Sequence, residues 1–165
     1  MTDKWPETRL GTELYGLNRE FLELLRDGAR EPHVFGLDAP LRQRLAGFSP
    51  AQLDSIARTP CLLASFSVLP PARSARRVAE PTGLRPTPMP APLAEAARLF
   101  AASLLAWLWH AAREDRLLAV LCMGPGLHDL DGLAGAPFSD LQRAAVTATE
   151  HLAARFCRPA RLWPD

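Results

Sequence analysis

The sequence lacks the excess of positive charge that is typical of nucleic-acid-binding domains. Lys4 is its only lysine, and 19 basic residues nearly balance 18 acidic ones, for a net charge of +1. Phosphate contacts usually require an excess of Lys and Arg, so this charge does not predict nucleic-acid binding, although it leaves room for a local basic patch. The strong preference for Arg over Lys suggests a GC-rich bacterial genome.

Long apolar runs are also missing. The longest, residues 99–112, is too short for a membrane span and lies between Arg98 and Arg113, so it predicts a buried helix. No secretory signal precedes the chain, which predicts a protein of the reducing cytoplasm with no membrane partner. Cysteine is scarce: Cys61, Cys122 and Cys157 form no C-x-x-C pair, and each stands in apolar sequence, where a small buried side chain is expected.

Sequence signatures of catalysis and of metal binding are absent. There is no G-x-S-x-G motif, phosphate-binding glycine loop or dinucleotide fingerprint. The densest polar cluster is residues 128–131, with His128, Asp129 and Asp131, but no second histidine follows at i+3 or i+4. A solvated turn is the simpler interpretation of this cluster. The sequence therefore predicts a protein that is not an enzyme and has no cofactor and no metal site.

What the sequence does contain is helical periodicity in two blocks, separated by prolines. At 165 residues and 48% hydrophobic, the chain is expected to fold, and the fold class predicted is mainly α. Residues 12–68 and 93–165 form the two predicted helical units. Residues 69–92 hold seven prolines together with Arg73, Arg76, Arg77 and Arg85, which predicts an extended linker or surface arm.

The first unit carries the clearest helix signals. Residues 12–30 have apolar positions at helical spacing, and a second helix is predicted from Asp38, an N-cap followed by Pro40. Ser49 and Gln52 have the spacing of a capping box, and Phe48 and Leu53 that of a hydrophobic staple. Residues 61–68 then fit either a helix extension or a short strand.

The second unit is predicted to start with a long helix, residues 93–113. Trp107 and Trp109 are two residues apart and cannot share a face, so one is predicted in the core and the other at an interface. Residues 116–123 fit a buried strand or another helical turn. A final helix is predicted over 140–157.

An internal repeat is visible when the two units are aligned. Phe138-Ser139-Asp140-Leu141-Gln142 matches Phe48–Gln52 as a second capping box, and at the same offset of 90 residues Leu62, Ala64 and Phe66 match Leu152, Ala154 and Phe156. Further back, Leu22, Leu25 and Ala29 match Leu105, Leu108 and Ala112. Chance identity between Ala- and Leu-rich helices competes with this interpretation. A true duplication would let the two units pack as a pseudo-dimer within one chain.

The segment Leu14–Phe66 resembles the flagellar transcriptional regulator FlhD family. The resemblance rests on Leu17-Asn18 and the Phe21/Leu24/Leu25 helix, on Phe35-Gly36-Leu37, and on Leu45-Ala46-Gly47-Phe48-Ser49-Pro50-Ala51-Gln52-Leu53. It continues through Ile56-Ala57-Arg58-Thr59 and Leu62-Leu63-Ala64-Ser65-Phe66. The subunit-linking cysteine of some family members falls at Ala64 here, and the family's C-terminal region is replaced by the arm and residues 93–165.

The resemblance implies a helical, dimeric subunit that influences transcription through a partner protein and DNA. The expected partners are a second copy of the chain or a partner regulator subunit, with DNA contacted as part of a complex. Leu17, Phe21, Leu24 and Leu25, with Trp107 and Trp109, are the predicted interface residues. Arg58, Arg73, Arg76 and Arg77 are the predicted contacts to nucleic acid or partner, against the simpler interpretation of a solvated arm. The alternative function is a structural or adaptor module that keeps the fold without transcriptional work.

Overall fold

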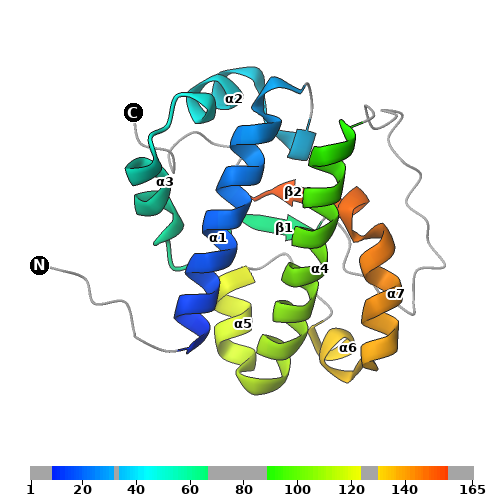
Figure 1. The fold of residues 1–165 in the computed structure, drawn as a ribbon. Coiled ribbons are helices and arrows are strands. Elements are labelled where there is room, and N and C mark those ends of the chain that lie inside the picture. The colour runs from blue at the N-terminus through cyan, green and yellow to red at the C-terminus, as the bar shows by residue number, and fades with distance from the viewer. Residues whose placement is uncertain (1–8, 32–33, 67–88, 124–129, 156–165) are drawn as a thin grey trace, which may run out of the picture.

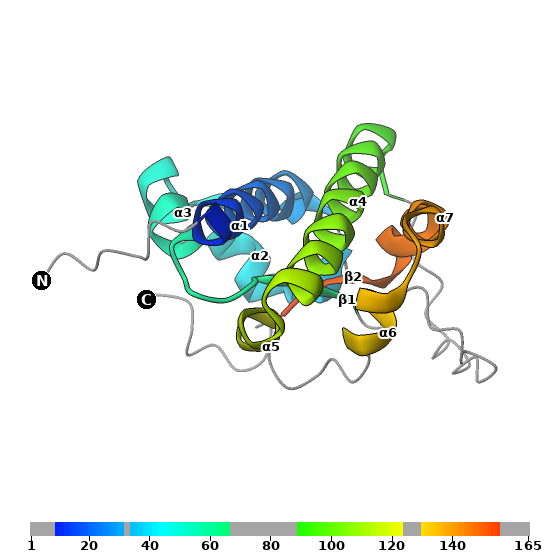
Figure 2. The same cartoon turned by 90° about the horizontal axis from the view of Figure 1, so that it is seen from below.

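The structure, a computed structural model, describes residues 9–31, 34–66, 89–123 and 130–155, and these are mainly helical, as predicted. Two long helices, α1 (Arg9–Asp27) and α4 (Ala91–Glu114), pack side by side in one layer (Figure 1). Beneath them lies a sheet of two short strands (Figure 2). Strand β1 (Ala64–Phe66) pairs antiparallel with β2 (Leu152–Ala154), so two segments far apart in the sequence meet under the helices.

Shorter helices flank each long helix. Those that pack against α1 are α2 (Ala39–Ala46) and α3 (Pro50–Ala57). Those that pack against α4 are α5 (Arg116–Met123), α6 (Leu130–Gly135) and α7 (Phe138–Ala148). Three single 3-10 turns complete the described elements: Gly28–Arg30, Val34–Gly36 and Thr149–His151.

Local cap signals set the start of α2 and α3 as the sequence predicts. The Asp38 side chain accepts a hydrogen bond from the Leu41 N–H at 2.9 Å. At α3 the capping box is complete, because the Ser49 hydroxyl accepts the Gln52 N–H while the Gln52 side chain accepts the Ser49 N–H. Each cap satisfies helix N–H groups that have no partner within the helix.

The predicted second capping box, at Ser139 and Gln142, does not form. Helix α7 begins at Phe138, one residue before Ser139, and its N-cap is Pro137 with no side-chain cap. In the first copy the proline follows the serine and occupies the first helical turn, whereas in the second the proline comes two residues before the serine. The Pro137 carbonyl accepts the N–H groups of Asp140 and Leu141, so the first turn already encloses Ser139.

The predicted final helix over 140–157 is also wrong in its second half. Helix α7 ends at Ala148, and residues 152–154 form β2. Nothing in Leu152-Ala153-Ala154 favours a strand locally. Pairing with β1 stabilises the extended form, because each strand satisfies the other's N–H and C=O groups. For two segments the sequence allows either a helix or a strand. Residues 61–68 contain the strand β1, and residues 116–123 form the helix α5.

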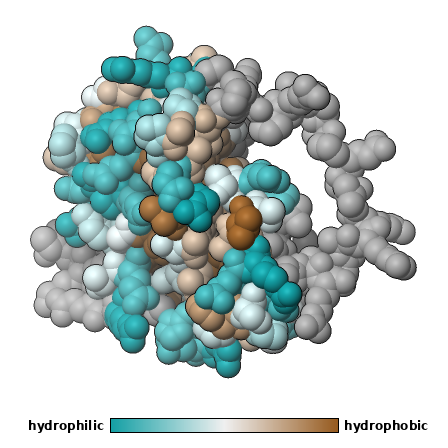
Figure 3. All heavy atoms as spheres, turned by 45° about the vertical axis from the view of Figure 1, so that its right-hand side comes forward, coloured by the Kyte–Doolittle hydropathy of each residue, from teal (hydrophilic) through white to brown (hydrophobic). Residues whose placement is uncertain are grey.

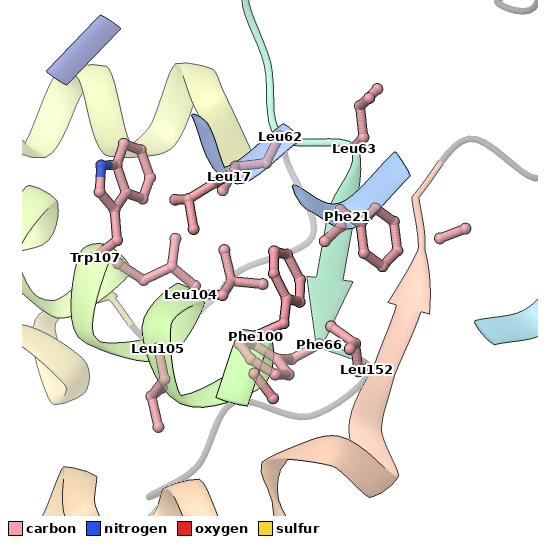
Figure 4. Close-up of a cluster of buried hydrophobic side chains, with 14 of the residues drawn as sticks. Leu17, Phe21, Leu62, Leu63, Phe66, Phe100, Leu104, Leu105, Trp107 and Leu152 are labelled. Carbon is pink, nitrogen blue, oxygen red and sulfur yellow. The ribbon is translucent and has the colours of Figure 1, made fainter. Parts of the chain in front are cut away.

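One hydrophobic core spans both predicted units. Phe21 of α1 and Phe100 of α4 stack with ring centroids 5.2 Å apart, and the Phe35 ring packs edge-on against Phe21 at 5.9 Å. Leu17 and Leu104 belong to the same buried cluster, shown in Figure 4. Phe35 and Gly36 have positive φ, 55° and 75°, which turns the chain so that Phe35 reaches this core.

Helix α4 is the central element of that core. Its buried face includes Ala97, Phe100, Ala101, Leu104 and Leu108, and contacts α1, α5, α6 and α7. Among the described residues it is also the one helix long and apolar enough to cross a membrane, a test that buried core helices of globular proteins pass as well.

Candidate interaction site

The loop after α3 is held in place by Asn18, the only asparagine in the chain. Asn18 is 1% exposed, and its amide nitrogen lies within hydrogen-bond distance of three carbonyl oxygens while its side-chain oxygen accepts a backbone N–H. The carbonyls belong to Ala57, Thr59 and Cys61, at 3.2, 3.3 and 2.9 Å, and the N–H belongs to Leu63, at 3.0 Å. One α1 side chain thereby sets the path from α3 to β1, including the position of Arg58.

Beside this loop, α1 and α3 share a polar cluster on their outer faces. Arg19 Nε lies 2.6 Å from Asp54 Oδ1, and the Tyr15 hydroxyl donates to the same carboxylate at 3.2 Å. Arg19 also pairs with Glu23 at 2.6 Å. The Arg58 guanidinium lies over the Tyr15 ring, 5.4 Å from its centroid. Arg58, a predicted contact residue, is thus exposed at the surface next to a fixed aromatic ring.

The Arg19 guanidinium, through its hydrogen bond, holds the pKa of Asp54 below its usual range, and the Tyr15 hydroxyl acts in the same direction. A carboxyl whose folded pKa is lowered stabilises the protein above its unfolded pKa and loses this contribution as pH falls. We expect the gap in unfolding free energy between wild type and Asp54→Asn to be widest near neutral pH and to close below about pH 4. Urea unfolding at pH 3, 5 and 7 measures it, with Glu20→Gln as an exposed control on α1. An unchanged gap at all three values would contradict this.

The predicted interface residues of α1 lie inside the chain. Leu17, Phe21, Leu24 and Leu25 are all buried, with Phe21 and Leu25 fully so. Phe21 faces α4 through the Phe100 stack, so this face of α1 contacts the second half of the same chain. The contacts that the sequence assigns to subunit packing are here contacts within one molecule.

The two tryptophans of α4 have different surroundings, as their spacing predicts. Trp107 is 7% exposed and lies in the core cluster (Figure 4). Trp109 is half-buried: its Nε1–H donates to the Ala136 carbonyl at 3.0 Å, and the Arg113 guanidinium lies 4.5 Å from its ring centroid. Trp109 therefore anchors the connection between α6 and α7 to α4. It makes an interface between elements of this chain.

The arm arginines Arg73, Arg76 and Arg77 lie outside the described residues, as do His128 and Asp129 of the polar cluster. The third member, Asp131, is in the first turn of α6 and pairs with Arg116 at 3.1 Å. Within the described ranges no group of three His, Cys, Asp or Glu side chains is placed to hold a metal ion.

Helix α5 carries a surface feature that the sequence analysis missed. Leu117, Val120 and Leu121 are 70%, 41% and 63% exposed and stand at i, i+3 and i+4, while Ala119 and Cys122 on the other side are buried. We call these three residues the α5 stripe. The sequence predicts either a buried strand or another helical turn for residues 116–123, and neither prediction specifies an exposed apolar face.

The stripe differs from the other exposed apolar residues. Those are Leu99 on α4 and Phe138 and Val146 on α7. On the side of the molecule occupied by α4 and α7, hydrophobic residues form separate spots among hydrophilic ones (Figure 3). Scattered exposed apolar residues are ordinary, whereas a contiguous apolar helix face is typical of an interaction surface.

Comparisons of the chain with protein-family models, with curated proteins and with solved structures give no match.

Proposed function

We propose that the chain is an internal duplication whose halves pack as a pseudo-dimer. The two halves have the same order of elements: a long helix, short helical segments, a further helix and a short strand. In each half the long helix packs against the helix that precedes the strand, α1 with α3 and α4 with α7. The halves meet through like elements, α1 with α4 and β1 with β2.

The register of the strands supports a pseudo-two-fold axis. The offset of 90 residues makes Ala154 the counterpart of Ala64, and these two residues are direct cross-strand partners. In an antiparallel pair related by a two-fold axis, only a residue on the axis lies opposite its own counterpart. In the helices the offset is 83, which makes Leu17–Leu104 the counterpart of the stacked pair Phe21–Phe100. All four side chains lie in one cluster (Figure 4).

On this basis we propose that the protein is a FlhD-like regulatory subunit that influences transcription through a partner protein and DNA. The observation that carries the proposal is the ordered resemblance over Leu14–Phe66. Most of its apolar positions, though not Ala46, Phe48 or Ala51, are buried in the structure, and its Asn18 holds the loop that joins α3 to β1. In a pseudo-dimer the contacts between two subunits are made within one chain. We therefore assign the contacts with other molecules to the exposed α5 stripe and to Arg58.

Mobility-shift measurements at low salt test the DNA part. We expect a shift of double-stranded DNA when the full chain is combined with its partner regulator, and weakening of that shift as salt rises. Non-specific binding has dissociation constants of about 10⁻⁴–10⁻⁶ M. Absence of binding at protein concentrations well above this range, with and without the partner, would overturn the DNA part of the proposal.

The α5 stripe supplies the test of the partner contact. Leu121→Asp places a charge on the apolar α5 stripe. A buried unpaired charge opposes association, so we expect loss of the partner in affinity purification. Because Leu121 is 63% exposed, the melting temperature should stay within a few degrees of wild type. Val146→Asp, at a 71% exposed valine on α7, is the matched control and should keep the partner. Equal retention by both variants would exclude the stripe from the contact.

A second candidate is a structural or adaptor module with the same fold. The near-neutral charge and the extent of the second half favour it. Identification of the proteins that the full chain retains, with Leu121→Asp as the specificity control, separates the two functions. RNA polymerase or a transcription regulator would support the regulatory subunit, and secretion or other assembly components would support the adaptor.

A further inference from the structure

Two cysteines that lie 61 positions apart in the sequence meet at the junction of the two halves. Cys61 follows α3, and Cys122 lies in the last turn of α5. The Leu62 N–H donates to the Cys122 carbonyl at 3.0 Å. Because this bond joins atoms next to the two Cα positions, Cys61 Cα and Cys122 Cα lie at most about 8 Å apart, and bends at the nitrogen and oxygen shorten this further. Disulfides need a separation of about 4.4–6.8 Å.

The two thiols also share their surroundings. Cys122 is 1% exposed and Cys61 is half-buried. Burial, and then the charge of the Cys61 thiolate, raise the pKa of Cys122 to about 11. The Arg155 side chain donates to the Cys122 carbonyl, and its positive charge favours the thiolate of both cysteines. The Arg155 N–H donates to the Leu63 carbonyl at 2.8 Å, which extends the β1–β2 ladder to this point.

We propose that Cys61 and Cys122 are a modification site that low-molecular-weight disulfides oxidise to an intramolecular disulfide. The half-buried Cys61 meets the oxidant first. Its thiolate attacks one sulfur of glutathione disulfide and expels a glutathione thiolate, which leaves a mixed disulfide on Cys61. The Cys122 thiolate then attacks the Cys61 sulfur and expels the second glutathione thiolate. Each departing thiolate takes up one of the two cysteine protons, so one disulfide and two thiols become one disulfide and two thiols.

The bond joins the first half, at the loop held by Asn18, to α5 in the second half. Cross-linking residues far apart in sequence restricts the unfolded chain, so the oxidised protein resists unfolding more than the reduced one. The site rests on contacts within the described residues and holds whether or not the protein regulates transcription. It makes the junction between the halves responsive to the thiol–disulfide balance of the cell.

The test uses the full-length protein incubated with glutathione disulfide, followed by intact-mass measurement and peptide mapping without reductant. We expect loss of the mass of two hydrogen atoms, a cross-linked peptide pair containing Cys61 and Cys122, and a rise in melting temperature of about 10 °C that dithiothreitol reverses. Because Cys61 and Cys122 are largely protonated at neutral pH, the reaction should accelerate from pH 7 to pH 9.

Three serine variants make the assignment specific. Cys122→Ser should stop at the mixed disulfide, seen as one added glutathionyl group on Cys61, and Cys61→Ser should give no intramolecular bond. Cys157→Ser should behave as wild type. A cross-link that includes Cys157, or wild-type protein that keeps both thiols free after prolonged incubation with the oxidant, would overturn the proposal.

Discussion

Replacing Asn18 with leucine is expected to destabilise the protein by about 3–5 kcal/mol. The leucine fills a similar volume, but it leaves without partners the carbonyl groups of the α3–β1 loop and the Leu63 N–H that Asn18 now satisfies. Each buried polar group left without a partner costs about 1–3 kcal/mol. Since free energies of unfolding of about 5–15 kcal/mol are usual, this loss would be a large fraction of the protein's total stability.

Urea unfolding followed by far-UV circular dichroism measures this loss. Gln43→Leu introduces the same residue at an exposed site of α2 and should change stability by less than about 0.5 kcal/mol. Asn18→Asp is the complementary variant: the carboxylate can still accept from Leu63 but cannot donate to the carbonyls, and it should be at least as unstable. Leucine at position 18 with near wild-type stability would show that the loop does not depend on Asn18.

Truncating Phe100 to alanine is expected to cost about 3–5 kcal/mol and to destabilise both halves together. The Phe100 ring is 1% exposed and stacks on Phe21 of the other half, so its removal leaves a cavity at the junction of α1 and α4. Because one core serves both halves, circular dichroism, which reports all helices, and tryptophan fluorescence should show one coincident transition.

A double-mutant cycle isolates the aromatic contact. Phe21→Ala, Phe100→Ala and the double variant should show a coupling energy of about 0.5–1.5 kcal/mol, the range for aromatic pairs beyond their burial. Phe138→Ala, at a phenylalanine on α7 that is 54% exposed, is the control and should cost much less. Separate transitions by the two probes in Phe100→Ala would show that the halves unfold independently and would contradict a single shared core.

Short-range signals in the sequence were sufficient to predict most helices. Asp38 and the Ser49–Gln52 box act within three residues of the helix start, so their geometry hardly depends on the rest of the chain. The same reasoning failed at Ser139, where the spacing of a capping box is present but Pro137 starts the helix earlier. The spacing of a capping box therefore predicts the helix start only when the proline follows the serine, as Pro50 follows Ser49, and not when it comes before it.

The candidate site was less accessible to sequence reasoning. Arg58 could be named, but its place over Tyr15 depends on how α3 packs against α1. The exposure of Leu117 and Leu121 could not be predicted, because an apolar residue on a helix is buried only where a neighbouring element covers it. Cys61 and Cys122 are unrelated in the sequence and become neighbours only when α5 folds back toward β1.

The sequence by itself therefore determined the helical class and the starts of α2 and α3, because periodicity and capping act over a few residues. Tertiary structure alone decided that residues 64–66 and 152–154 pair as strands, that Leu17 and Phe21 pack within one molecule, and that α5 keeps an exposed apolar stripe. Those outcomes depend on contacts between segments tens of residues apart. These contacts stabilise the protein only after folding has brought the segments together.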